Sequence, residues 1–366
     1  MSSSLPTFID GYDVALPSIE RELTTFWKNI AGSQQNVAVL RATTLNLIII
    51  VRGREGYEQA RELVPKITAH HPGRIILVYM DPQRETQDIA ARIAIYCQPP
   101  HNGGRQICCE YINLVTNDND VQQIHGAVLP LLLPDLPVFL YAPDEHLLRE
   151  GTLEDFTKMS TRMVVNLPTE LTRPSLLDLS ERILNLQGTN VSDLAWSALT
   201  TWREALAQFF DTKKSLDQLN QLSSLSITTS GSPNSTPAML LISWLGARLD
   251  WQFDSRSSGR QFAVRFNDHI VDIHFFSAGS EIESGGLLRV ELTATGNGAQ
   301  ISFTCQRTPD NCLRLQKTEN GVLTLDNTMS LTAAKNECLL CGELDFIDVD
   351  KVYNQTLEKL QQLLKD

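Results

Sequence analysis

The chain has 366 residues, 42% of them hydrophobic, which is ordinary for a globular protein and long for a single hydrophobic core. Its formal net charge of −12 argues against a continuous basic surface for nucleic acid, because phosphate binding needs clustered Lys and Arg. No apolar run reaches the roughly 18 residues of a membrane span, and the N-terminus lacks the basic and apolar regions of a signal peptide, so we expect a cytoplasmic protein without membrane contact.

The N-terminal half alternates apolar runs of strand length with segments whose apolar residues recur at helical spacing. The runs predict strands at 44–51, 74–79, 107–115, 138–141 and 163–167. The predicted helices cover 14–30, 55–67, 121–133, the surroundings of Leu153, and 175–186. Continuous apolar strands favour a sheet that is covered on both faces. We therefore predict a layered α/β domain over residues 1–222, with a largely parallel sheet and helices on both faces.

The composition changes after this half. Residues 223–237, SSLSITTSGSPNSTP, are almost all small, polar or turn-forming, which predicts a linker or a long loop. Strand-like runs separated by turn residues follow at 261–266, 270–276, 287–295, 300–305, 312–317 and 322–325. Asn-Gly between such runs indicates hairpins. Helices are predicted at 239–249, 331–341 and 349–364. We therefore predict an α+β domain with an antiparallel sheet over residues 238–366.

The motifs that usually mark catalysis or nucleotide binding are missing from the sequence. No G-x-G-x-x-G follows a strand, and neither a Walker loop nor a G-x-S-x-G elbow occurs. The histidines are scattered without partners at ligand spacing, so we predict no catalytic residues, no metal site and no cofactor. Arg52 and Arg54 follow the first strand directly. They could meet an anion there, with a solvated turn as the alternative.

Seven cysteines form an odd count without a regular framework, which suits reduced thiols in a cytosol better than a secreted disulfide scaffold. Cys338 and Cys341 have redox or zinc spacing, but their helical context favours two core cysteines. Zinc would need Cys305 and Cys312 as further ligands across an unusual gap. If a hairpin turn is centred on residues 308–309, these two cysteines face each other and a reversible disulfide becomes feasible.

Residues 192–211, SDLAWSALTTWREALAQFFD, carry two of the five tryptophans at the join of the predicted domains. From Trp202 onward the apolar residues follow helical spacing, which predicts a core helix that closes the first domain. Trp and Arg also dominate protein interfaces, so Trp196, Trp202 and Arg203 are candidates for partner contact. We expect both tryptophans in the core and Arg203 at the surface, since a guanidinium can pair a partner carboxylate bidentately.

Several segments carry a resemblance to a known family. They occur in the order RATTLNL (41–47), HPGRIIL (71–77), PLLLPDLPV (130–138), DLAW…TTWREALAQFFD (193–211) and LGARLDW (245–251). Together they resemble the OpcA family, the glucose-6-phosphate dehydrogenase assembly or effector proteins. The resemblance implies a non-catalytic partner of that dehydrogenase in the oxidative pentose phosphate pathway, stabilising its oligomer or its active conformation. Cyanobacterial members are regarded as redox-responsive, which implies thioredoxin as a further candidate partner and assigns no particular cysteine.

The candidate partner-binding residues are therefore Arg203, Trp196, Trp202, Asp193 and Asp135, with structural packing as the alternative for each. A function from a different class stays open, namely an α/β enzyme or a sensor with an unrecognised site for a sugar phosphate or another anion. A pull-down from lysate distinguishes the two. Recovery of the dehydrogenase would support the effector, whereas a tightly bound metabolite would support the sensor.

Overall fold

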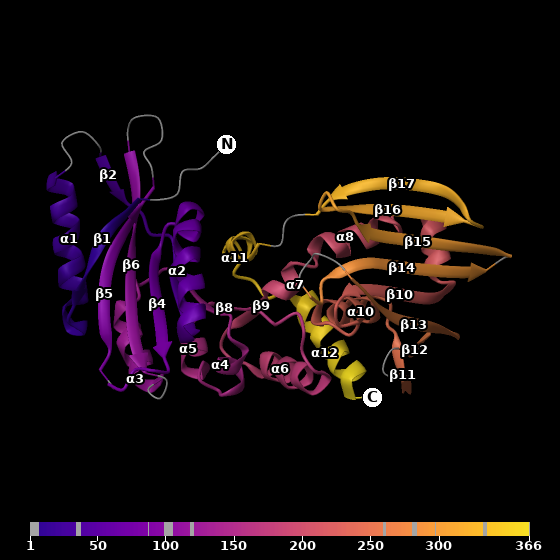
Figure 1. Ribbon diagram of the computed structural model, residues 1–366, viewed down its shortest axis with the longest axis horizontal. Coiled ribbons are helices and arrows are strands. Elements are labelled where there is room, and N and C mark those ends of the chain that lie inside the picture. The colour runs from indigo at the N-terminus through magenta and orange to yellow at the C-terminus, as the bar shows by residue number, and fades with distance from the viewer. Residues whose placement is uncertain are drawn as a thin grey trace. The chain divides into compact units, whose positions relative to one another are not determined.

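The computed structural model describes residues 7–33, 38–86, 88–98, 105–117, 121–258, 261–279, 284–296, 298–331 and 335–365. The chain folds into two compact units, each assembled from separated stretches (Figure 1). Unit 1 comprises Met1–Asn166, Leu186–Ser192 and Lys335–Val349, and unit 2 comprises Leu167–Asn185, Asp193–Ala334 and Asp350–Asp366. This division differs from the predicted 1–222 and 238–366, because residues 167–185 and 193–222 belong to unit 2 and residues 335–349 belong to unit 1.

The described part of unit 1 is built on a nine-stranded sheet in the order β1-β5-β6-β4-β3-β7-β8-β9, with β2 beside β6. The strands are β1 (Thr7–Val14), β2 (Ala38–Arg41), β3 (Asn46–Arg52), β4 (Arg74–Asp81), β5 (Ala90–Cys97), β6 (Arg105–Asn117), β7 (Val138–Ala142), β8 (Arg162–Val165) and β9 (Asn190–Asp193). Neighbours from β6 through β4, β3 and β7 to β8 are parallel, whereas β5 pairs antiparallel with β6 and β1. Numbered by chain position, β6-β4-β3-β7-β8-β9 stand in the order 3-2-1-4-5-6, a doubly wound arrangement. The predicted α/β architecture is confirmed.

Helices cover this sheet on both faces. They are α1 (Ile19–Ser33), α2 (Gly53–His70), α3 (Val121–Val128), α4 (Glu145–Arg149), α5 (Glu154–Met159) and α11 (Asn336–Leu344), with short 3-10 turns η1 (Leu16–Ser18) and η2 (Leu129–Leu131). Figure 1 shows α1 and α2 on opposite sides of the strands. Residues 47–51 of β3 and 75–78 of β4 are at most 2% exposed, as continuous apolar strands between two helical layers require.

Helix α11 belongs to unit 1 although the residues before and after its stretch belong to unit 2. The buried Arg162 of β8 places Nη2 at 2.6 Å from Oε2 of Glu343. Lys66 of α2 places Nζ at 3.2 Å from Oε1 of Glu337. These two ion pairs attach the two ends of α11 to strand β8 and to helix α2.

The described part of unit 2 is built on an eight-stranded sheet in the order β11-β12-β13-β10-β14-β15-β16-β17. The strands are β10 (Leu222–Ser230), β11 (Gln252–Ser258), β12 (Gln261–Phe266), β13 (His269–Ala278), β14 (Leu287–Gly296), β15 (Ala299–Arg307), β16 (Cys312–Glu319) and β17 (Val322–Ser330). Apart from the parallel pair β10 and β13, the paired strands are antiparallel, as predicted. The helices are α6 (Arg173–Asn185), α7 (Leu194–Ser197), α8 (Thr200–Gln208), α9 (Lys213–Leu219), α10 (Thr236–Arg248) and α12 (Lys351–Lys365). None of the helices in the described ranges is long and apolar enough to cross a membrane.

The segment interpreted as a linker needs correction. Residues 223–230 lie in β10, which pairs with both β13 and β14 inside the sheet of unit 2. Leu225, Ile227 and Thr229 are fully buried on one face, while Ser226 and Thr228 lie on the other face and are half-buried. The Ser- and Thr-rich composition therefore reflects one polar face of a strand, and a loop remains only between β10 and the start of α10.

The expectation that the cysteines are reduced thiols is wrong for one pair. Cys97 and Cys108 form a disulfide, and their Cα atoms are 4.0 Å apart. The two residues lie directly opposite each other in the antiparallel pair of β5 and β6. The sequence pattern does not indicate β5 as a strand, so it does not reveal the pairing that brings these cysteines together.

Counting thiols tests this disulfide. Cys109, Cys305, Cys312, Cys338 and Cys341 are free, so unfolding without reductant should expose five reactive thiols of the seven cysteines. Reduction before the assay should raise the count to seven. The Cys97→Ser variant should give six with or without reductant, and seven thiols in the untreated wild type would contradict the pairing.

A buried ion cluster lies where the amino end of β4 pairs with the middle of β6. Arg74 is 1% exposed, and its Nε donates to Oε2 of the equally buried Glu110 at 2.8 Å. The guanidinium also pairs with Glu20 of α1. Oε1 of Glu110 accepts from the indole N–H of Trp27 at 2.7 Å and lies 2.8 Å from Nη2 of Arg41. Every charge in this cluster has a partner, which is what burial of a carboxylate and a guanidinium requires.

Candidate functional site

Doubly wound sheets bind ligands at the carboxyl ends of their strands, where the strand order reverses. Here the reversal lies between β3 and β7, since β4 follows β3 on one side and β7 joins it on the other. Arg52, the last residue of β3, donates from Nη1 and Nη2 to the two carboxylate oxygens of Glu150 at 2.9 and 2.8 Å. Glu150 follows α4, directly after β7. A bidentate ion pair therefore spans the position at which the crevice of such a sheet would open.

The ion pair with Arg52 also affects the pKa of Glu150. The hydrogen bonds from Arg52 lower the pKa of this carboxyl below its usual range. Arg52 thus already has a carboxylate partner in the position where the sequence suggested an anion. Arg54 is exposed and lines a separate cavity, so the structure does not join the two arginines in one anion site.

That cavity, called here the β3–β4 cavity, has a volume of about 480 Å³. It is lined by Gly53, Arg54, Tyr57, Glu58, Tyr79, Asp81, Pro82 and Gln83. The rings of Tyr57 and Tyr79 stack with centroids 4.4 Å apart. Asp81 ends β4, and its Oδ1 accepts from the backbone N–H of Gln83 at 3.0 Å. The cavity thus combines an aromatic pair, a carboxylate held in place and a glycine turn at the start of an 18-residue helix.

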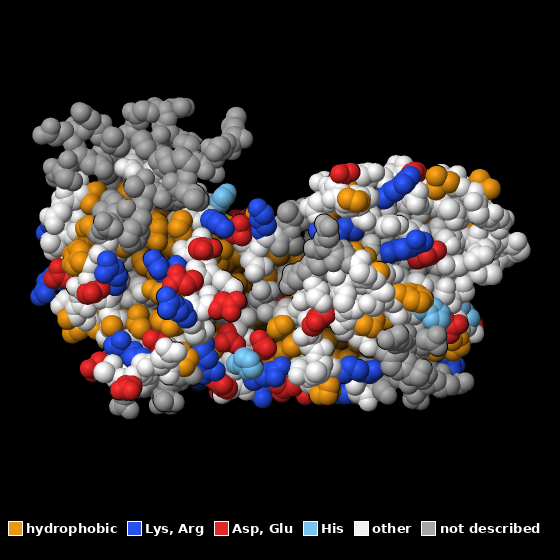
Figure 2. Space-filling view, in the orientation of Figure 1, with side chains coloured by type: hydrophobic (Ala, Val, Ile, Leu, Met, Phe, Trp, Pro, Cys, Tyr) orange, Lys and Arg blue, Asp and Glu red, His pale blue; other side chains and the backbone are white. Residues whose placement is uncertain are grey.

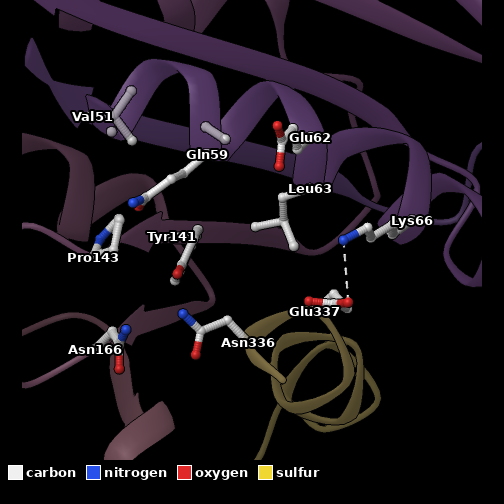
Figure 3. Close-up of a pocket in the computed structure, with 12 residues that line it drawn as sticks. Val51, Gln59, Glu62, Leu63, Lys66, Tyr141, Pro143, Asn166, Asn336 and Glu337 are labelled. Atoms are coloured by element: carbon white, nitrogen blue, oxygen red, sulfur yellow. Dashed lines mark hydrogen bonds and ion pairs between the residues drawn. The ribbon is translucent and has the colours of Figure 1, made fainter. Parts of the chain in front are cut away.

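A second hollow of unit 1, the α2–α11 groove, has a volume of about 260 Å³ and is lined on one side by α2 (Figure 3). Gln59, Tyr141, Asn166 and Asn336 contribute polar side chains to it. Burial raises the pKa of the Tyr141 hydroxyl, so this group stays protonated at neutral pH. Among the described residues that line the groove there is no cysteine, serine or histidine. The groove offers hydrogen bonds and three charged side chains, those of Glu62, Lys66 and Glu337.

The stretch that carries Asp193, Trp196 and Arg203 forms a packed cluster within unit 2. The Oδ1 atom of Asp193 accepts from the backbone N–H of Ala195, which caps α7, and its Oδ2 atom accepts from the hydroxyl of Tyr353 at 3.2 Å. The indole N–H of Trp196 donates to Oδ2 of Asp350 at 2.8 Å. The guanidinium carbon of Arg203 lies 3.5 Å from the centroid of the Trp196 ring. This segment fastens α7 to α12.

Two family models match the chain, and both describe a glucose-6-phosphate dehydrogenase subunit. The model for the N-terminal domain of that protein matches residues 64–180, and the model for its C-terminal domain matches residues 189–357. The chain belongs to the OpcA family. The matches cover the larger part of the strands and helices of both units.

Curated relatives carry the same family name. A protein described as a putative OxPP cycle protein OpcA, from Nostoc punctiforme, is 25% identical over 329 residues, which are 83% of this chain and 67% of that protein. The protein of the same name from Synechococcus elongatus is 26% identical over 319 residues, or 82% and 69% of the two chains. The match to the Synechocystis protein covers 50% of this chain and 38% of that protein. This OpcA-family chain thus spans about two thirds of its longer-matching relatives, and less of the third.

Solved structures resemble the chain more distantly. A mutant of KijD10, a 3-ketoreductase from Actinomadura kijaniata in complex with TDP-benzene and NADP, is 9% identical with a TM-score of 0.48 over 88% of this chain and 96% of that chain. Biliverdin reductase from Synechocystis, in complex with biliverdin and NADP+, is 10% identical with a TM-score of 0.44 over 88% and 97%. Identities of this size say nothing about a shared activity.

The candidate partner-binding residues of this OpcA-family chain differ in accessibility. Trp196 and Trp202 are 2% and 4% exposed and lie in the core, as expected, and Asp193 is fully buried as a helix cap. A partner has no access to these three side chains in this conformation. Arg203 is half-buried over Trp196, and Asp135 is exposed in a turn with φ of 62°. Partner contact by the last two residues stays a prediction.

The cysteine hypotheses need two further corrections. Cys305 pairs with Leu315 in the register of β15 and β16, and Cys312 pairs with Ser330 of β17. The hairpin turn lies farther along the chain than its assumed centre, so Cys305 and Cys312 do not face each other and both are free. Burial raises the pKa of Cys305 to about 12 and that of Cys341 to about 11, which keeps little thiolate at neutral pH. Cys338 is exposed at the start of α11 and Cys341 is half-buried, so the interpretation of the two as core cysteines is wrong for Cys338.

Sequence reasoning missed Glu150, Tyr57, Tyr79 and Asp81. Glu150 comes from a segment 98 residues from its partner Arg52, and nothing in the sequence connects the two. Asp81 carries a signal that could have found it, because an acidic residue directly after the second strand of a βαβ unit is the usual ribose ligand of doubly wound folds. Without the first glycine of the fingerprint, the sequence does not mark this strand as part of such a unit.

Proposed function

We propose that this chain is a non-catalytic effector that binds glucose-6-phosphate dehydrogenase and activates it in the oxidative pentose phosphate pathway. The observation that carries the proposal is the match of both halves of the chain to models named for subunit domains of that dehydrogenase. The activating partner must bind the competent state of the enzyme better than the other state, because a ligand shifts an equilibrium only by its difference in affinity. Stabilising the active oligomer or the active conformation meets this condition.

The side chains at the carboxyl edge of the sheet support the proposal that the chain is not a catalyst. The Arg52–Glu150 ion pair lies where a hydride-transferring enzyme of this topology would hold the reacting half of its cofactor. Neither the β3–β4 cavity nor the α2–α11 groove contains a described cysteine, serine or histidine. Both observations favour recognition over chemistry.

The surface charge agrees with a protein partner. On the face drawn in Figure 2, Lys and Arg side chains alternate with Asp and Glu and form no continuous basic patch. A cytoplasmic location remains a prediction from the sequence. The matched families and the relatives described above do not name thioredoxin, and thioredoxin forms no part of this proposal.

Mixing the two purified proteins tests the proposal. The dehydrogenase should co-elute with this chain and should form NADPH faster in its presence, whereas this chain alone should form none. Absence of both a complex and any rate change would exclude the effector role. Turnover by this chain without the dehydrogenase would exclude its non-catalytic nature.

Arg203 is our candidate for a contact residue, because its guanidinium lies half-buried on α8 and can present a planar charge to a partner carboxylate. The Arg203→Ala variant should lose about 2 kcal/mol of binding to the dehydrogenase, the scale of an interface hot spot, with a melting temperature close to wild type. Trp202→Ala serves as the contrast and should melt early. Binding assays and thermal shift measurements on both variants show which variant loses binding and which loses stability. An Arg203→Ala protein that activates normally would remove this residue from the interface.

A further inference from the structure

The turn between β3 and α2 retains two of the three glycines of a nucleotide-binding βαβ unit. Gly53 has φ of +72°, and a Cβ added there would meet nothing within 4 Å, so a ligand can approach this backbone. Gly56 stands at the position of the third glycine, although a Cβ there would make only an ordinary van der Waals contact, 3.5 Å from Cβ of Val51. Val51 stands where the G-x-G-x-x-G pattern has its first glycine. The local backbone thus keeps the features that receive a phosphate, although the sequence pattern is incomplete.

The next strand supplies the second element of such a site. Asp81 ends β4 and lines the β3–β4 cavity together with Gly53 and Arg54. In this position of a doubly wound sheet, a carboxylate accepts hydrogen bonds from a ribose diol. The stacked Tyr57 and Tyr79 add an aromatic wall to the same cavity. One cavity of about 480 Å³ thus brings together a glycine turn, a carboxylate and an aromatic wall, the kinds of group that bind the phosphates, ribose and base of a nucleotide.

The other half of a dinucleotide site is closed. The extended nicotinamide end of a cofactor would cross from β3 towards β7, where Arg52 and Glu150 form their bidentate pair. The residues therefore fit the nucleoside half of a dinucleotide and do not fit its reactive half.

We infer that the β3–β4 cavity binds the nucleoside end of a ribonucleotide, with the 5′-phosphates over Gly53 and Arg54 and the ribose diol on Asp81. Two carboxylates, Glu58 and Asp81, line the cavity and oppose a 2′-phosphate. The site therefore favours ligands with a free 2′-hydroxyl, such as ADP or NAD+, over NADP+. This inference does not depend on the dehydrogenase partner.

Calorimetric titration of the full chain with ADP tests the site. Saturable binding is expected, and 2′-deoxy-ADP should bind about tenfold more weakly, since it lacks one hydrogen bond to a charged group. NAD+ should bind no more tightly than ADP, because the Arg52–Glu150 pair excludes its second half. NADP+ should bind more weakly than NAD+, and Asp81→Asn should narrow this difference.

A matched glycine pair separates ligand loss from backbone strain. Gly53→Ala places a methyl group in the space assigned to the phosphates and should weaken ADP binding at least about tenfold. Gly321, in the turn between β16 and β17, has φ of +79° and equally open space, so Gly321→Ala carries the same strain away from the cavity. Both variants should lose a similar amount of stability, and only Gly53→Ala should bind ADP more weakly.

Three results would overturn the inference. One is the absence of saturable ADP binding to the wild type, and another is wild-type affinity in a folded Gly53→Ala protein. A much tighter binding of NAD+ than of ADP would show that the reactive half is open. Dehydrogenase binding is measured separately, so a failure here leaves the effector proposal intact and is distinguishable from its failure.

Discussion

Replacing Arg74 with alanine should lower the free energy of unfolding by about 3 kcal/mol. Removing one partner of a buried ion pair typically costs about 3–5 kcal/mol, because the remaining charge stays in a low-dielectric core. Glu110 is 1% exposed, but it keeps Trp27 and Arg41 as partners, so we expect the lower end of that range. The loss also leaves the carbonyl of Leu131 without the hydrogen bond that it accepts from Nη1 at 2.6 Å. Chemical unfolding of wild type and variant measures the difference.

A surface ion pair provides the control. Arg182 and Asp178 form an i,i+4 pair on α6 with side chains 41% and 45% exposed. Such pairs contribute about 0.3–0.5 kcal/mol, so Arg182→Ala should change the unfolding midpoint little. In a second comparison, Arg74→Met combined with Glu110→Gln should recover part of the loss, since the charges that lose their partners, on Glu20 and Arg41, are then 54% and 46% exposed to solvent. Equal effects of Arg74→Ala and Arg182→Ala would contradict the buried cluster.

Trp196→Ala should destabilise the protein by about 3–5 kcal/mol, the usual cost of emptying a large aromatic site in a core. The side chain is 2% exposed, and the centroid of its ring lies 3.5 Å from the guanidinium carbon of Arg203 and 5.6 Å from the centroid of the Tyr353 ring. The substitution would also leave Asp350 without the indole N–H that it accepts. Thermal and chemical unfolding measure the loss.

Trp196→Phe separates packing from the hydrogen bond. Phenylalanine keeps most of the aromatic volume beside Tyr353 and removes only the donor, so we expect a loss of about 1–2 kcal/mol. A Trp196→Ala protein that melts like the wild type, yet binds the dehydrogenase poorly, would instead identify Trp196 as an interface anchor. The two variants together therefore distinguish a core tryptophan from an exposed one.

The strands that the sequence predicts best are those buried on both faces. β3 and β4 are apolar at almost every position because helices cover them on both sides, and their sequences show it directly. β5 alternates between exposed and buried residues at its start and lies near the edge of the sheet, so its signal is weaker. β10 has the composition of a linker because serine and threonine fill its polar face. A composition rich in serine and threonine indicates a flexible segment only where every second residue is not buried against the rest of the protein.

Only those features of the candidate site that lie within one short segment of the chain can be predicted from the sequence. Arg52 and Arg54 stand out in the sequence because they follow a strand directly, and position along one chain segment is visible without a structure. Their different environments depend on Glu150, which a distant segment brings to Arg52. The buried state of Asp193 likewise depends on Tyr353, 160 residues away. Contacts of this separation are decided by tertiary packing, which spacing patterns do not encode.

The order in which the stretches of unit 1 occur along the chain has a consequence for synthesis on the ribosome. Helix α11 and its ion pairs with Lys66 and Arg162 come from Lys335–Val349, far behind the last sheet strand of this unit. At translation rates of about 5–20 residues per second, the partly folded sheet waits roughly 7–30 s for α11 to be synthesised. During that interval the buried guanidinium of Arg162 has no carboxylate from Glu343. The nascent sheet therefore lacks both ion pairs until the C-terminal stretch has been synthesised.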